Sequence, residues 1–344
     1  MNRMKCFGAI VLCLGLCCLA AAQTQKGPQP LKLVKTIPLP GVEGRIDHMN
    51  VDVRGKRLFL AALGNQSVEI VDVAAGKLLH SISGLGGDPE GIVYVPESNL
   101  LFVTAGTPGV NIYDGTSYKL IRSIPAPGND NLRYDPQSAA DFGAGLVFVT
   151  IVPGLRAMDS RDGKPVYDVK FTDNGPRPEG FQVEKLPGSR RLFANMTYQG
   201  YIAVADLAKK GEVIAKWPVQ GFKQFFPMTL DEQDHRLFIG SRAPAALVVY
   251  DTTSGKMVTS VPGMAHTDDV FYDAAHKRVY MMGGEGAIGV FAQRDPDHYE
   301  LVAKVPNAPG ASTGFFSPEL NQLFVPTTRY AGQPAKVLVY EAQP

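Results

Sequence analysis

Four carboxylic acids stand at related positions before an aromatic residue that recurs along the chain. Asp47, Glu90 and Asp268 each precede that aromatic by 12 residues. Glu179 would occupy the equivalent position if the turn at residues 184–189 is slightly longer than the matching turn of the other repeats. Carboxylates that approach one another are destabilising unless a proton or a cation compensates. Oxygen ligands of this kind suit Ca²⁺ or Mg²⁺. One prediction is therefore a divalent cation held by Glu90, Glu179 and Asp268.

Further polar side chains lie beside these acids in the sequence. Asn131 and Asp269 would add oxygen ligands, and the imidazoles of His48 and His266 would extend the ligand set to transition metals. The alternative is structural, because acids that precede a strand commonly accept hydrogen bonds from backbone amides of a turn. Both interpretations require that separate parts of the chain meet at one place.

The recurrent aromatic residue indicates how they could meet. Its copies are Phe59, Phe102, Phe148, Phe193, Phe238, Tyr280 and Phe324. Each lies in a short apolar segment, and successive copies are 43, 46, 45, 45, 42 and 44 residues apart. A period in the low-to-mid forties is that of four-stranded, WD40-like propeller blades. The sequence therefore predicts seven blades.

Each repeat divides into four strand-like segments separated by turns. In the first repeat they are residues 47–53, 57–63, 67–73 and 77–82. A helical solenoid has a comparable period, but these segments are short, rich in Val, Ile, Phe and Tyr, and frequently broken by Gly and Pro. The expected fold class is therefore all-β, a seven-bladed β-propeller with four-stranded blades.

The two ends of the chain provide a check on this prediction. The last repeat ends after a third-strand segment, residues 337–340, while residues 31–37 resemble the fourth-strand segment 77–82. We therefore expect the N-terminal strand to complete the last blade and close the ring, which avoids an open break. In a propeller, the segments that lead into the first strands emerge on one face. The acids would then meet at the mouth of the central channel, which is the default binding site.

Loops between the second and third strands emerge on the same face and carry further candidates. These are Tyr198, Arg242 and Arg329. Arginines beside tyrosines can hold an anionic or sugar-like ligand through forked hydrogen bonds and ring stacking. The alternative is that these side chains are exposed loop residues without a ligand.

Tetrapeptides in the second-strand segments resemble the Tyr-Val-Thr-Asn signature of YVTN-type, YncE-like bacterial propellers. Residues 102–105 read Phe-Val-Thr-Ala and residues 148–151 read Phe-Val-Thr-Ile, although no copy carries the final Asn. The resemblance covers about residues 31–344 and implies an exported propeller of poorly defined activity. Some relatives are associated with DNA binding or cell-surface layers. The formal net charge of +1 argues against nucleic acid, which normally requires a basic surface.

The N-terminus is typical of a signal peptide spanning residues 1–22. Arg3 and Lys5 precede an apolar stretch too short to span a bilayer comfortably, and a run of alanines offers a cleavage site. All 4 cysteines fall in this segment, so the mature chain is expected to lack disulfides. Residues 23–30 are expected to be a linker and residues 31–344 the propeller. We expect a periplasmic or secreted monomer with no membrane span after cleavage.

Two functions remain open from the sequence. The first is a binding protein that engages a small molecule or a protein partner at the channel mouth, because the scaffold carries no recognisable catalytic signature. The second is a metal-dependent enzyme that uses Ca²⁺ or Mg²⁺ with the channel carboxylates and histidines. It rests on analogy with propeller lactonases, which gather Glu, Asn and Asp, and with propeller lyases, which pair His and Glu. Whether the chain is an enzyme is left open.

Overall fold

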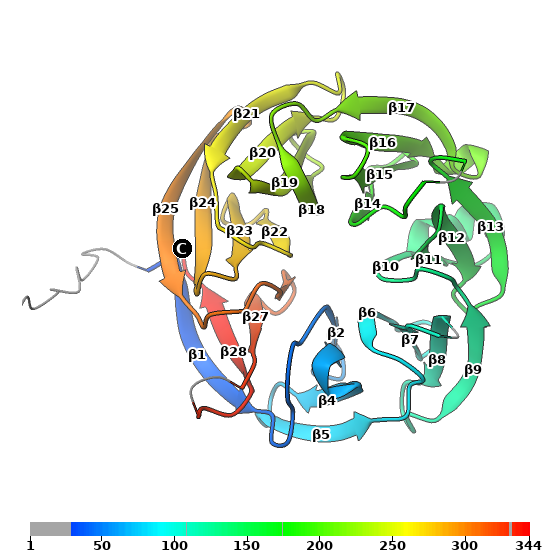
Figure 1. Cartoon of the computed structure of the whole chain (residues 1–344), viewed down its shortest axis with the longest axis vertical. Helices are drawn as coiled ribbons and strands as arrows, with labels where there is room; N and C mark the ends of the chain where they lie inside the picture. The colour runs from blue at the N-terminus through cyan, green and yellow to red at the C-terminus, as the bar shows by residue number, and fades with distance from the viewer. Residues whose placement is uncertain (1–28, 108, 174, 330–331) are drawn as a thin grey trace, which may run out of the picture.

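The computed structural model describes residues 29–107, 109–173, 175–329 and 332–344. Their strands form seven four-stranded antiparallel sheets in a ring around a central channel (Figure 1). The predicted seven-bladed β-propeller is therefore confirmed. The predicted signal peptide and most of the predicted linker lie outside the described residues. Within the described ranges, no helix has the length and apolar character needed to cross a bilayer.

Each blade runs from a short inner strand beside the channel to an outer strand at the perimeter (Figure 1). Blade 1 comprises β2 (Met49–Asp52), β3 (Arg57–Ala62), β4 (Ser67–Asp72) and β5 (Lys77–Ile82). Blade 2 comprises β6 (Pro89–Val95), β7 (Leu100–Ala105), β8 (Gly109–Asp114) and β9 (Leu120–Pro125). Blade 3 comprises β10 (Leu132–Asp135), β11 (Leu146–Ile151), β12 (Gly154–Asp159) and β13 (Pro165–Lys170).

The remaining blades repeat this order. Blade 4 comprises β14 (Phe181–Val183), β15 (Arg191–Met196), β16 (Tyr201–Asp206) and β17 (Glu212–Pro218). Blade 5 comprises β18 (Lys223–Asp231), β19 (Arg236–Ala243), β20 (Ala245–Asp251) and β21 (Met257–Pro262). Blade 6 comprises β22 (Val270–Asp273), β23 (Arg278–Gly283), β24 (Ala287–Asp295) and β25 (His298–Pro306). Short helices lie in connections: η1 (Leu63–Asn65), η2 (Pro136–Ser138), α1 (Ala139–Phe142) and η3 (Leu207–Lys209).

Blade 7 is assembled from both ends of the chain. It comprises β26 (Phe315–Ser317), β27 (Gln322–Thr327), β28 (Lys336–Ala342) and, as its outer strand, β1 (Leu31–Pro38). The antiparallel register of β1 on β28 runs from Leu31 opposite Ala342 to Pro38 opposite Lys336. Closure of the ring by the N-terminal strand, predicted from the sequence, is therefore confirmed.

The repeat aromatic is completely buried in every blade. Phe59 of blade 1, for example, belongs to a buried cluster with Ile92, Leu101 and Val103 of blade 2. It therefore joins two blades as well as anchoring its own. Replacing a buried Phe by Ala typically costs about 3–5 kcal/mol, so a side chain of this size is favoured at the same place in each repeat. The core consequently lies between the blades.

Four arginines join neighbouring blades on one face of the propeller, which we call the clip end. On this face the first strand of each blade ends and the second begins. We call them the clip arginines: Arg57, Arg191, Arg236 and Arg278. Each is the first residue of the second strand of its blade. Each donates a hydrogen bond to a backbone carbonyl of the next blade, on Gly115, Thr252, Pro296 and Gln343, respectively. These contacts fix each blade against its neighbour at this end.

Candidate functional site

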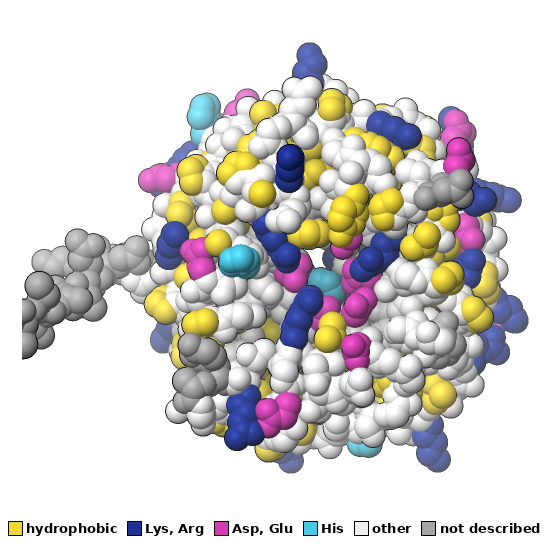
Figure 2. All heavy atoms as spheres, in the orientation of Figure 1, with side chains coloured by type: hydrophobic (Ala, Val, Ile, Leu, Met, Phe, Trp, Pro, Cys, Tyr) yellow, Lys and Arg dark blue, Asp and Glu magenta, His cyan; other side chains and the backbone are white. Residues whose placement is uncertain are grey.

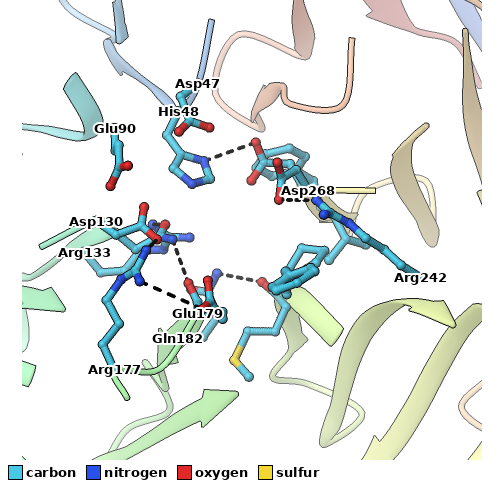
Figure 3. Close-up of a pocket in the computed structure, with 18 of the residues that line it drawn as sticks. Asp47, His48, Glu90, Asp130, Arg133, Arg177, Glu179, Gln182, Arg242 and Asp268 are labelled. Carbon is cyan, nitrogen blue, oxygen red and sulfur yellow. Dashed lines mark hydrogen bonds and ion pairs between the residues drawn. The ribbon is translucent and has the colours of Figure 1, made fainter. Parts of the chain in front are cut away.

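The channel opens on the other face into a cavity of about 200 Å³, which we call the mouth cavity. Figure 2 shows charged side chains gathered around this central hollow. Among the described residues, blades 1 to 6 line it, mainly through the segments that lead into their first strands (Figure 3). Its charged groups are Arg45, Arg133, Arg177, Arg242, His48, Asp47, Glu90, Asp130, Glu179, Asp268 and Asp269.

Backbone and side-chain hydrogen bonds hold the lead-in segments against neighbouring blades. The amide of His48 donates to the carbonyl of Glu90 in blade 2 at 3.2 Å. Asn131 of blade 3 donates from Nδ2 to the carbonyl of Glu179 in blade 4 at 2.8 Å. Thr104 of blade 2 donates from its buried hydroxyl to the carbonyl of Asp130 in blade 3 at 2.6 Å. The mouth residues are therefore positioned by the packing of the ring itself.

Two arginines form ion pairs on opposite sides of the cavity. The guanidinium of Arg177 lies 2.7 Å from the carboxylate of Asp130 and 3.9 Å from that of Glu179. Arg242 lies 2.7 Å from Asp268, and its guanidinium stacks over the Phe226 ring at 4.3 Å. A carboxylate therefore fixes the orientation of each guanidinium group, and with it the direction of the remaining N–H groups.

Arg45 is the third arginine at the rim. It lies 2.8 Å from Asp47 and 3.2 Å from Asp268, so it connects blade 1 to blade 6 across the opening. Its side chain is 52% exposed, unlike the nearly buried carboxylate of Asp47. We call Arg45, Arg177 and Arg242 the mouth arginines. They compensate four of the carboxylates that would otherwise repel one another.

His48 and Asp269 both line the mouth cavity, and Figure 3 shows the imidazole of His48 directed into it. Nδ1 of His48 lies 3.4 Å from the Asp269 carboxylate, which also accepts a hydrogen bond from the amide of Gly314 at 3.0 Å. Burial alone would lower the pKa of His48, but Asp269, Asp47 and Asp130 outweigh it and raise the pKa to about 10. The imidazole is therefore protonated and positive at neutral pH.

Glu90 differs from the other acids of the cavity. Among the described residues, its carboxylate has no hydrogen-bond or ion-pair partner, and Figure 3 shows it on the side of the cavity opposite Arg242. Burial and the nearby carboxylates of Asp130 and Asp47 raise the pKa of Glu90 to about 7, although Arg177 acts in the opposite direction. This carboxyl therefore changes its charge near neutral pH.

The channel continues beyond the mouth cavity. A second cavity of about 440 Å³ lies further along it, and five side chains line both spaces: His48, Arg133, Gln182, Asp269 and Phe271. Arg133 donates to the carbonyl of Leu132 at 2.7 Å and to Oδ1 of Asn131 at 3.2 Å. These five residues lie at the boundary between the mouth cavity and the rest of the channel.

Most of the residues predicted from the sequence line the mouth cavity. They are Asp47, His48, Glu90, Asn131, Glu179, Arg242, Asp268 and Asp269. Tyr198 lies at the rim, 68% exposed, close enough to Glu179 to oppose the rise in its pKa. His266 is exposed in a turn with a φ of 54° and is not part of the lining. Arg329 forms an exposed ion pair with Glu43, also outside the cavity lining.

Five further polar or charged residues line the mouth cavity and were not predicted from the sequence: Arg45, Asp130, Arg133, Arg177 and Gln182. The three arginines precede their repeat aromatics by 14, 15 and 16 residues, respectively, so no common spacing marks them. Asp130 could have been found, because it directly precedes a residue that was selected. Charge compensation was the other available signal, since converging acids require nearby cations.

The predicted cation ligands do not form a group of free carboxylates. Asp268 and Glu179 are ion-paired with arginines. A different set, Asp47, His48 and Asp130, brings one ligand atom from each residue within 4.8 Å of the others. A divalent cation therefore stays a prediction, and in both sets every acid other than Glu90 is already paired with an arginine.

Comparisons with known proteins agree with the fold and go no further. No family model and no curated protein matches the sequence. Among solved structures, a chain of the "Crystal Structure of Mitotic Checkpoint Complex" has a TM-score of 0.73 and 11% identity, over 100% of this chain and 99% of that chain. An identity this low shows a common propeller architecture only. The relation to YVTN-type propellers stays a prediction.

Proposed function

We propose that this chain is an exported binding protein that takes a charged group of a small molecule or of a partner protein into the mouth cavity. The observation that supports the proposal is the convergence of eleven charged side chains from six blades on one concave space of about 200 Å³. Concave sites with a few convergent polar groups are where proteins usually bind ligands. The similar chain in a multiprotein structure is compatible with a protein partner.

The mouth cavity is organised in a way that favours recognition. Its mouth arginines are held by carboxylates, and its lead-in segments are held by bonds between blades. A ligand therefore meets groups that are already ordered, so little conformational entropy is lost on binding. Charged groups at the rim also steer an oppositely charged partner towards the opening.

A panel of metabolites screened by thermal shift tests this proposal. A ligand at one hundred times its Kd stabilises the folded state by roughly 2.7 kcal/mol, which is readily detected. Asp268→Asn, at the mouth, should reduce the shift for any ligand found. Glu300→Gln is a matched loss of one exposed carboxylate on β25, outside the cavity, and should leave the shift unchanged. A ligand that stabilises all three proteins equally binds elsewhere and contradicts the proposal.

A second candidate function is favoured by the ionisation of two acids. Glu90 has a pKa of about 7, and burial raises the pKa of Asp268 to about 6 against the effect of Arg242. A carboxyl that titrates near neutral pH can donate and accept protons efficiently. A lyase- or lactonase-like enzyme would use Glu90 in this role. Turnover that is lost in Glu90→Gln, with folding intact, would replace the binding proposal by this one.

A further inference from the structure

The charges of the mouth cavity leave one carboxylate uncompensated. Six carboxylates face four guanidinium groups and one imidazolium, so full ionisation gives a formal sum of −1. Five carboxylates have an ion-pair partner: Asp47 with Arg45, Asp130 and Glu179 with Arg177, Asp268 with Arg242 and Arg45, and Asp269 with His48. Glu90 is the one carboxylate among the described lining residues without an ion-pair partner; the one guanidinium without an ion-pair partner, that of Arg133, donates instead to Asn131 and Leu132.

The groups around Glu90 determine what could approach it. Asp47 and Asp130 act on Glu90 as like charges, while Arg45 and Arg177 act as opposite charges. These two arginines already contact Asp47, Asp130 and other acids, so neither is free to pair with Glu90. A cation that arrives from solvent would therefore be attracted by Glu90 without displacing an existing ion pair.

An aromatic surface begins on the other side of the mouth cavity. Tyr198, Phe222 and Phe226 line an open cavity of about 620 Å³ between blades 4 and 5, which we call the aromatic shelf. Phe226 lines both the shelf and the mouth cavity. Tyr198 is 68% exposed, and Phe222 and Phe226 are half-buried. A ligand with its charged group in the mouth cavity would find apolar contact on the shelf.

We propose that the mouth cavity takes an organic cation, an ammonium or guanidinium group placed at Glu90, whose apolar body extends across Phe226 onto the aromatic shelf. This inference rests on the proposed binding function and specifies the class of ligand. Ca²⁺ usually takes 6–8 oxygen ligands, whereas one free carboxylate suits an ammonium group with three N–H donors. The shelf adds area that a metal ion could not use.

A matched set of ligands tests the inference by isothermal titration calorimetry. Tyramine, 2-(4-hydroxyphenyl)ethanol and 3-(4-hydroxyphenyl)propionate share the aromatic body and present an ammonium, a hydroxyl and a carboxylate. Tyramine should bind roughly tenfold or more tightly than the alcohol, because a hydrogen bond to a charged partner is stronger than a neutral one. Equal or tighter binding of the alcohol or the acid would overturn the inference while leaving the proposed function intact.

The proton released on binding provides an independent readout. At about pH 6 the Glu90 carboxyl is mostly protonated, and a cation beside it lowers its pKa. Tyramine binding should therefore release a proton, seen as a binding enthalpy that changes between buffers of different ionisation enthalpy. Glu90→Gln should lose this release and bind tyramine at least about tenfold more weakly. Glu300→Gln should behave as the wild type; unchanged proton release in Glu90→Gln would overturn the assignment.

Additional titrations distinguish the sources of the cation. A blocked Lys-Phe dipeptide places the same ammonium on a peptide, and agmatine presents a guanidinium and an ammonium without an aromatic ring. Tighter binding of the dipeptide than of tyramine would support a protein partner within the same class. Stabilisation by Ca²⁺ or Mg²⁺ that is lost in Glu90→Gln, with no binding of any organic cation, would overturn the inference in favour of a metal site. Binding of no cation at millimolar concentration would also overturn it.

Discussion

The two ends of the propeller use arginine side chains in different ways. The clip arginines donate to backbone carbonyls of the adjacent blade, and three of them also pair with carboxylates outside the mouth cavity, as Arg191 does with the buried Glu184 at 2.7 Å. The mouth arginines instead contact carboxylates that line a cavity open to solvent. At the clip end, the hydrogen bonds are satisfied within the protein. At the mouth end, the ion pairs line a space that a ligand can enter.

The spacing of the two sets in the sequence follows this difference. Every clip arginine stands two residues before the repeat aromatic of its blade. The mouth arginines follow no such rule: Arg45 and Arg177 precede their aromatics by 14 and 16 residues, whereas Arg242 follows Phe238 by four. Contacts between blades recur in each repeat because the interface recurs. Among these seven arginines, those that keep the period hold neighbouring blades together and those that depart from it line the mouth cavity.

The largest effect is expected for Arg191→Ala at the clip end. The substitution leaves Glu184, whose side chain is 1% exposed, without its guanidinium partner and the Thr252 carbonyl without its donor. Removing one partner of a buried ion pair costs about 3–5 kcal/mol. Urea denaturation should show this loss. Arg161→Ala removes an exposed arginine on a turn and serves as the control; a similar loss in both variants would contradict the structural role of the clip.

A smaller loss of stability is expected for Arg177→Ala at the mouth. Water reaches Asp130 and Glu179, so the cost should be about 1–3 kcal/mol, below that of Arg191→Ala. Because Arg177 lowers the pKa of Glu90, its removal should also raise the pKa of Glu90 further. NMR titration of the Glu90 side-chain carbon checks this direction. Equal losses in the two variants would remove the distinction between the ends.

The third prediction concerns the pH dependence that Glu90 imposes. Its pKa is raised from the ordinary glutamate value of 4.5 to about 7 in the fold, so the stabilisation by its protonated form is complete below pH 4.5 and is lost as the pH rises through 7. With solvent screening, the loss should be on the order of 1 kcal/mol. Glu90→Gln should therefore have a flatter profile of unfolding free energy across this range. A profile that matches the wild type would contradict the raised pKa.

The smallest effect is expected for Arg329→Ala. Arg329 and Glu43 form an exposed ion pair outside the mouth cavity, and exposed pairs of this kind contribute about 0–1 kcal/mol. The melting temperature and tyramine binding should both stay close to those of the wild type. A clear loss of tyramine binding would mean that the binding surface extends beyond the mouth cavity to blade 7.

The fold could be predicted because its determinants repeat. One buried aromatic per blade gives the period, and the unmatched strands at the two ends identify closure, as the pairing of β1 with β28 confirms. The acids of the site could be placed for the same reason, since three of them keep a constant distance from the aromatic. His266 illustrates the limit of this approach: it belongs to the correct segment, but the local backbone places it outside the cavity lining.

The remaining site residues could not be derived from spacing, because they come together only through the ring. Arg45 contacts Asp268, which is 223 residues away in the sequence. Such a pair has no local signature, and its partners are defined by the neighbouring blades rather than by adjacent positions. The charge requirement of the converging acids was the available physical signal, and it indicated the need for cations without identifying which arginines would provide them.

The closure strand also determines how the molecule can be attached to a surface. Leu31, at the start of β1, pairs with Ala342 near the end of β28, and the clip arginine Arg278 donates to the carbonyl of Gln343. The first and last described strands therefore have their free ends together, remote from the mouth cavity. A tether, affinity label or sensor chip linked through either end would leave the opening directed towards solution.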